Sequence, residues 1–385
     1  MTRQLPTRPN WEQLTKQAKT FLKQLKSGDA GAIHRFEAFK NTGEFTLVAA
    51  QHVLAHEYGF ENWAALRKQV LATGDTEATG DLVQEWIRAA GRGDLDRVKE
   101  ILHRHPEIID ERGGDGTRTA LHIAAIGNRI ELAKLLLDRG ANPNIRCDGD
   151  SAFPLHFAAE KKSLEMVRLL IDHGADPIGE GDYHELGVIG WATVFADSRE
   201  VFEYLMAHGA RHNIFSAVAT GDAAAIRRLV AEYPGHLERR MDLTNQRRRP
   251  LHLAVVKKQP ESLATLIELG ANLEWIDEAE LTALDQAALS GEREMTEALL
   301  HAGAKLRLPA AIALNRTADI DRLLRREPDC LTPGKHWGTL IVRAAEISTG
   351  EVVERLLLAG ASVNVRDKTK TAIDNTNGYT PLHGA

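Results

Sequence analysis

Residues 119–144 read TALHIAAIGNRIELAKLLLDRGANPN, and this stretch predicts two short helices with a turn between them. Apolar residues recur at helical spacing on both sides of Gly127-Asn128, which breaks the chain. Thr119 can cap the first helix by accepting a hydrogen bond from a first-turn amide. Gly140 can end the second helix in a left-handed conformation. The stretch therefore predicts a helix, a turn, a second helix and a glycine stop.

The same pattern recurs along the chain with a period of about 33 residues. The clear openings are Thr119-Ala-Leu-His, Phe153-Pro-Leu-His, Arg249-Pro-Leu-His, Thr282-Ala-Leu-Asp and Thr380-Pro-Leu-His. Weaker copies place Ile87, Ile189, Phe215, Leu308 and Ile341 in the same register. A Gly-Ala pair ends most units, whereas Pro106, Pro234 and Pro328 take its place in three of them. We expect atypical loops after those prolines.

These motifs resemble the ankyrin-repeat family over roughly residues 81–385. The resemblance implies an all-α solenoid of helix-turn-helix units with projecting loops, called fingers below. We expect about nine to ten units, the last of them incomplete. It also implies that the opening histidines, His122, His156, His252 and His383, bridge neighbouring fingers by hydrogen bonds. Because the last unit stops at Ala385 inside its first helix, we expect a fragment that continues further.

Residues 1–72 differ from the repeats in charge, with 10 Lys and Arg against 6 Asp and Glu, whereas the whole chain has a net charge of −6. Apolar residues from Leu14 to Leu25 form one stripe of a predicted helix, and four lysines from Lys16 to Lys26 form another. Further helices are predicted over 46–57 and 63–70. This region resembles a helical segment that precedes ankyrin repeats in some bacterial proteins. We expect it to cap the first repeat, with a linker over 73–80.

Composition and motifs argue against several function classes. The net charge of −6 and 5% aromatic residues argue against a nucleic-acid partner. Polar N-terminal residues and two cysteines favour the reducing cytoplasm, and the apolar runs are too short to span a membrane. The sequence has no nucleophile elbow, phosphate loop or dinucleotide fingerprint. His52 and His56 share a helical face without an evident third ligand, so we expect no metal, cofactor or catalytic residue.

A repeat array leaves the side chains of its fingers and first helices free to vary, which suits protein binding. We expect a protein scaffold or adaptor that binds its partner with these candidates: Arg112, Asp115, Arg118, Arg146, Asp148, Phe157, Lys161, Tyr183, Trp191, Arg247, Arg248, Lys257, Trp275, Asp277 and Trp337. For Trp191, packing inside the repeat is as good an explanation as partner binding. Arg247 to Arg249 can simply form the solvent-exposed tip of a finger.

Two other functions remain open from the residues. The chain can be a regulatory or targeting module of a larger protein whose catalytic domain lies beyond Ala385. The lysine stripe of the first helix can contact an acidic partner, nucleic acid or a membrane surface. Adjacent fingers alternate in sign, with Arg247 to Arg249 beside Asp277 and Glu278, so a partner of mixed charge suits that face better than a polyanion.

Overall fold

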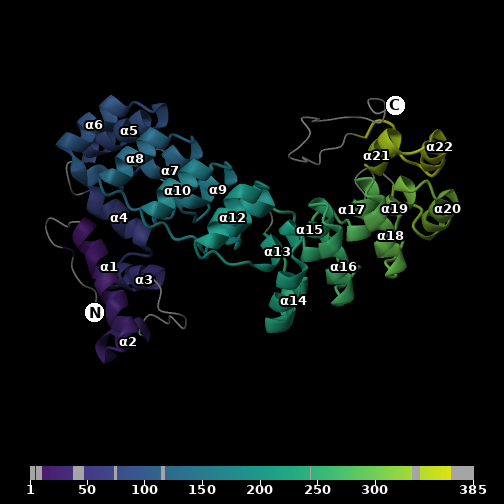
Figure 1. Ribbon diagram of the computed structural model, residues 1–385, viewed down its shortest axis with the longest axis horizontal. Helices are drawn as coiled ribbons and strands as arrows, with labels where there is room; N and C mark the ends of the chain where they lie inside the picture. The colour runs from purple at the N-terminus through teal and green to yellow at the C-terminus, as the bar shows by residue number, and fades with distance from the viewer. Residues whose placement is uncertain are drawn as a thin grey trace. The chain divides into compact units, whose positions relative to one another are not determined.

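A computed structural model describes residues 5, 11–37, 47–72, 76–113, 118–242, 244–331 and 339–365 (Figure 1). The chain divides into two compact units, residues 1–114 and 115–385. Helices dominate both units. The candidate residues Asp115 and Trp337 lie outside the described residues, as do His383 and the last expected repeat.

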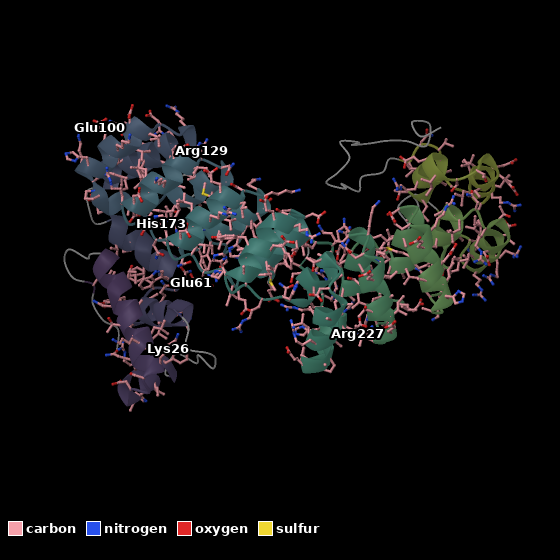
Figure 2. The ribbon with its side chains drawn as sticks, viewed as in Figure 1. Lys26, Glu61, Glu100, Arg129, His173 and Arg227 are labelled. Carbon is pink, nitrogen blue, oxygen red and sulfur yellow. The ribbon has the colours of Figure 1, made fainter. Side chains whose placement is uncertain are left out.

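The first unit is a small helical core followed by one helix pair. Its elements are α1 (Trp11–Lys26), α2 (Ala30–Glu37), α3 (Leu47–Glu57), α4 (Trp63–Ala72), α5 (Thr76–Arg92), α6 (Leu95–Arg104), the 3₁₀ helix η1 (Pro106–Ile108) and β1 (Arg112–Gly113). The apolar stripe of α1 is buried against α3 and α4, whereas Lys23 and Lys26 are exposed, as an amphipathic helix requires. Lys26 is labelled on α1 in Figure 2. Arg35 of α2 pairs with Glu57 of α3 at 2.7 Å.

Residues 76–80, which we expected in a linker, belong to α5. One glycine inside a helix costs only about 1 kcal/mol, which the rest of a long helix can offset. The α5/α6 pair packs around Trp86, whose side chain is fully buried. The capping role and the boundaries assigned to residues 1–72 stay predictions.

The second unit is a row of helix pairs (Figure 1). The pairs are α7 (Ala120–Ile126) with α8 (Ile130–Asp138), α9 (Pro154–Glu160) with α10 (Leu164–Asp172), α11 (Gly187–Gly190) and the π-helix η2 (Trp191–Phe195) with α12 (Arg199–Ala207), α13 (Ile214–Thr220) with α14 (Ala223–Glu232), α15 (Pro250–Val256) with α16 (Pro260–Glu268), α17 (Ala283–Leu289) with α18 (Arg293–His301), α19 (Leu308–Ala313) with α20 (Thr317–Arg326), and α21 (Leu340–Ile347) with α22 (Gly350–Leu358). Strand β2 (Arg118–Thr119) precedes the row, and the 3₁₀ helix η3 (Pro234–Glu238) follows α14.

The repeat pattern explains how the pairs stack. First helices contact the first helices of neighbouring pairs, as α7 contacts α9 and α15 contacts α17, and alanines on them are fully buried. Small side chains allow this close approach, and buried leucines of the second helices, such as Leu136 and Leu266, fill the space between pairs. Gly140 and Gly270 have φ of 89° and 84°, the left-handed conformation expected at the helix stops. The prolines at 106 and 234 instead begin 3₁₀ turns.

The fingers are hairpins joined to one another. Backbone hydrogen bonds close three of them, from Cys147 N to Ala152 O, from Met241 N to Arg248 O and from Asp277 N to Leu281 O. Others join successive fingers, from Tyr183 N to Asp150 O and from Glu278 N to Gln246 O. The finger after Pro234 is therefore longer than its neighbours but still joined to the next one.

Candidate partner-binding surface

Buried histidines at the repeat openings hold the fingers in place. The backbone N–H of Phe153 donates to Nδ1 of His156, so the Nε2–H of this neutral ring donates to the carbonyl of Gly179 in the next finger, at 3.0 Å. His122 reaches Ala152 O in the same way, and His252 reaches Leu281 O. Burial lowers the pKa of His156 to about 4, although nearby Asp182 opposes the shift. The bridging role implied by the resemblance is confirmed for these three histidines.

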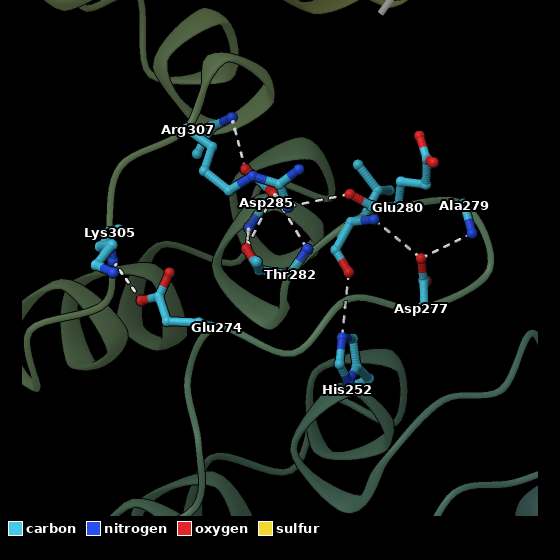
Figure 3. A network of polar contacts seen from close by, with 11 residues as sticks. His252, Glu274, Asp277, Ala279, Glu280, Thr282, Asp285, Lys305 and Arg307 are labelled. Carbon is cyan, nitrogen blue, oxygen red and sulfur yellow. Dashed lines mark hydrogen bonds and ion pairs between the residues drawn. The ribbon is translucent and has the colours of Figure 1, made fainter. Parts of the chain in front are cut away.

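Asp285 occupies the histidine position in the next unit and is fully buried. Figure 3 shows its contacts with Thr282 and Arg307. Its Oδ2 accepts hydrogen bonds from the backbone and hydroxyl of Thr282, and Arg307 of the following finger pairs with it at 3.0 Å. Arg307 also donates to Glu280 O, so it joins two fingers. Burial raises the pKa of Asp285, and Arg307 opposes that shift. An ion pair thus replaces the histidine bridge.

Trp191 lies inside the repeat stack. It is only 3% exposed, and its indole Nε1–H donates to Asp182 at 3.0 Å. Asp182 is itself buried and accepts the backbone N–H groups of Leu186 and Gly187. Phe157 contacts Trp191 edge to face, with ring centroids 5.3 Å apart. The packing alternative for Trp191 therefore fits the structure, since its polar atom and its ring both have internal partners.

Three of the fifteen candidates are buried: Phe157, Trp191 and Asp277. Asp277 lies at the base of its finger, where its carboxylate accepts backbone N–H groups of Ala279 and Leu281 (Figure 3). None of the three presents its side chain to a partner: Asp277 turns inward to close its hairpin, whereas Phe157 of α9 and Trp191 of η2 pack against each other. Five others are exposed: Asp148, Lys161, Tyr183, Arg247 and Trp275. Another five are half-buried: Arg112, Arg118, Arg146, Arg248 and Lys257.

Most of the half-buried arginines already form contacts or ion pairs with other residues of the repeat array. Arg146 lies over the Phe153 ring at 4.2 Å and donates to the carbonyls of Ser151 and Glu180, and burial lowers its pKa. Arg118 lies 3.8 Å from Asp150. Arg248 faces Asp277 at 4.0 Å, an ion pair without a hydrogen bond. These side chains support the fingers, so the freely presented groups are fewer than we expected.

A cleft between two fingers was missed by sequence reasoning. It measures about 550 Å³ and is lined by Tyr183, His184, Glu185, Phe215, Arg240, Met241, Asp242 and Arg247. His184 Nδ1 lies 3.0 Å from Asp242 Oδ2 across it, and Arg239 pairs with Glu185 at 2.8 Å. Burial alone would raise the pKa of Asp242, but hydrogen bonds from Asn245 and His184 lower it overall. Two of its lining residues, Tyr183 and Arg247, were expected to bind a partner, but no sequence pattern placed them next to Arg240 and Asp242.

Metal and thiol chemistry find little support among the described residues. His52 and His56 face each other with 3.1 Å between their Nε2 atoms, yet the described part of the chain holds no group of three or more possible ligands. Cys147 is buried, and burial raises the pKa of the Cys330 thiol, which disfavours the nucleophilic thiolate. Among the helices described, none has both the length and the apolar character needed to cross a membrane.

The stacked pairs and bridged fingers agree with a comparison against protein families. The model for ankyrin repeats (three copies) matches residues 86–180 and 189–310, more than half of the chain. The chain belongs to the ankyrin-repeat family. This match includes the end of α5 and all of α6, so the first ankyrin repeat begins in the first compact unit.

Individual relatives resemble only part of this ankyrin-repeat chain. An ankyrin repeat protein of Rickettsia bellii (strain RML369-C) is 39% identical over 64 residues, which are 16% of this chain and 9% of that protein. The E3 ubiquitin-protein ligase XB3 of Oryza sativa subsp. japonica is 39% identical over 66 residues, 17% of this chain and 14% of the ligase. The chain thus spans about a tenth of the length of these relatives. The crystal structure of the Bcl-3 ankyrin repeat domain covers 57% of this chain and 86% of its own, with 20% identity and a TM-score of 0.34.

Proposed function

We propose that this chain is a non-enzymatic protein that binds a partner protein through the finger surface of its ankyrin repeats. The observation that carries the proposal is the joining of successive fingers by backbone hydrogen bonds and histidine bridges. A surface held in this way is ordered before binding, so little conformational entropy is lost when a partner docks.

Exposed aromatic residues on this surface support the proposal. Tyr183 is 58% exposed and Trp275 is 41% exposed, and Arg249 lies 4.0 Å above the Trp275 ring. Tyr, Trp and Arg dominate the binding energy of protein interfaces because they combine a large rigid contact area with a polar group. The similarity to the rice ligase is confined to 66 residues, and we propose no ligase activity from it.

Site-specific photocrosslinking tests the proposal. A benzophenone amino acid replaces Tyr183, Trp275, Lys26 or Leu358 in the full chain, which is expressed in cells and irradiated. Leu358 of α22 is the control, because it is apolar and 83% exposed but lies on a second helix. We expect one protein to be captured from positions 183 and 275 and not from 358. Capture from position 26 of α1 instead, or equal and diffuse capture from all positions, would overturn the proposal.

A further inference from the structure

The cleft lined by Tyr183, Phe215, Arg240 and Met241 has an unused cation at its rim. Arg240 is exposed, and no carboxylate of the described residues pairs with it. The other charges of the cleft are engaged: Glu185 with Arg239 at 2.8 Å and Asp242 with His184 at 3.0 Å. Arg247 reaches Glu278 of the next finger at 3.4 Å. The cleft therefore offers one uncommitted positive charge.

Apolar groups surround that charge. Phe215 and Met241 are buried and form the floor of the cleft, while the Tyr183 ring is exposed at its rim. A volume of about 550 Å³ lies within the range of ordinary ligand pockets. An occupant that places an apolar group against Tyr183 and an anionic group against Arg240 would use both features.

We infer that this cleft receives a segment of a partner protein in which an Asp or Glu side chain pairs with Arg240 beside an apolar residue that packs on Tyr183. The inference rests on the proposed function and specifies the chemistry of its partner. A single carboxylate suits the cleft better than a phosphate, because Glu185 and Asp242 line it and repel a dianion. A nucleic acid would need a row of unpaired cations, whereas the neighbouring arginines 239 and 247 are already paired.

The test begins with the selection of random twelve-residue peptides, displayed on phage, against the full chain. We expect the selected peptides to be enriched in an acidic residue next to an apolar one. A synthetic peptide from this pool should lose about tenfold or more in affinity for Arg240→Glu. Arg293→Glu makes the same charge change at an exposed position of α18 and should leave the affinity unchanged. Thermal melting should show that both variants remain folded.

Charge reversal on the peptide separates pairing from general electrostatics. A peptide with Lys in place of its acidic residue should bind Arg240→Glu more tightly than it binds the natural chain. The inference is overturned if no peptide is selected, if selected peptides lack the acidic residue, or if both variants weaken binding equally. It is also overturned if single-stranded DNA binds and loses affinity in Arg240→Glu. If the selected peptides bind Arg240→Glu as tightly as the natural chain but lose affinity when Trp275 is replaced, this inference is wrong and the proposed function still holds.

Discussion

Buried histidines at three repeat openings each bond to the next finger, and two of them, His122 and His156, also accept a hydrogen bond from the backbone at the start of their own helix. In His156 one ring nitrogen accepts from the first-turn backbone while the other donates to the next finger. Both bonds require the neutral ring, since a protonated imidazole has no acceptor. The side chain is fully buried, which disfavours the charged form further. The bond from this histidine to the next finger thus depends on a protonation state set inside the repeat.

Acidification should therefore weaken the array through His156. Its folded pKa of about 4 lies below its ordinary value of 6.5, so the unfolded chain binds the proton more readily. Stability from the neutral ring is fully present above pH 6.5 and declines as the pH falls toward 4, by roughly 3 kcal/mol at most. Urea unfolding at pH 7 and pH 5 measures this decline.

Comparison with His156→Gln isolates the contribution of this ring from that of other titrating groups. The variant should lose about 1–3 kcal/mol at pH 7 and show a shallower decline. His301→Gln, at an exposed position of α18, should behave like the natural chain. Parallel pH curves for His156→Gln and the natural chain would show that the ring is not held neutral.

At the scale of one helix pair, different residues fill the same structural position. The α17/α18 pair uses Asp285 and Arg307 where other pairs use a histidine. The α13/α14 pair uses Ser216, which completes a capping box with Asn213. Asp285 and Ser216 each accept a hydrogen bond from the N-cap backbone N–H, as His122 and His156 do, so these helices begin at the same register. Asp285 and Arg307 differ in forming a charged link to the following finger.

Removing one partner of the buried pair should be costly. Arg307→Met leaves the fully buried carboxylate of Asp285 without its cation, and we expect a loss of about 3–5 kcal/mol. Arg316→Met removes an i,i+3 surface pair with Asp319 and should cost less than about 1 kcal/mol. Urea unfolding of both variants at pH 7 measures the difference. Equal small losses would show that Asp285 is neutral or solvated in the folded chain.

At the scale of the second unit, helix pairs contact their neighbours along the row, as α16 contacts α14 and α18 (Figure 1). Such an array has no single central core, so its stability is close to a sum of pair and interface contributions. A defect should therefore remain local, and the fingers next to it should lose order first.

Leu266→Ala tests this locality. Leu266 of α16 is fully buried, and its truncation should cost about 2–5 kcal/mol. Hydrogen exchange should rise in α14 to α18 and change little in α7 to α10. Leu358→Ala, at an exposed position of α22, should leave exchange unchanged throughout. A uniform rise across the unit would show that it unfolds as one cooperative block.

The local sequence predicts the helix pairs and the residues at which their helices begin and end. Thr119 caps its helix and Gly140 stops the next one because both depend on nearby backbone groups. The histidine bridges were also accessible, through the family resemblance. Local patterns were misleading at 76–80, where a polar, glycine-containing stretch belongs to a long helix.

Contacts between neighbouring repeats decide which side chains are exposed and which form ion pairs or hydrogen bonds. We expected Phe157 and Asp277 to face a partner, yet both are buried in the folded chain. The Arg240 cleft joins residues 183–185 with 240–247, whose proximity depends on how two fingers pack. The positions at which the repeats begin and end depend on hydrogen bonds to nearby backbone groups, so the sequence alone predicted them. Which side chains remain free for a partner depends on neighbours about one repeat away, and no local pattern reports those contacts.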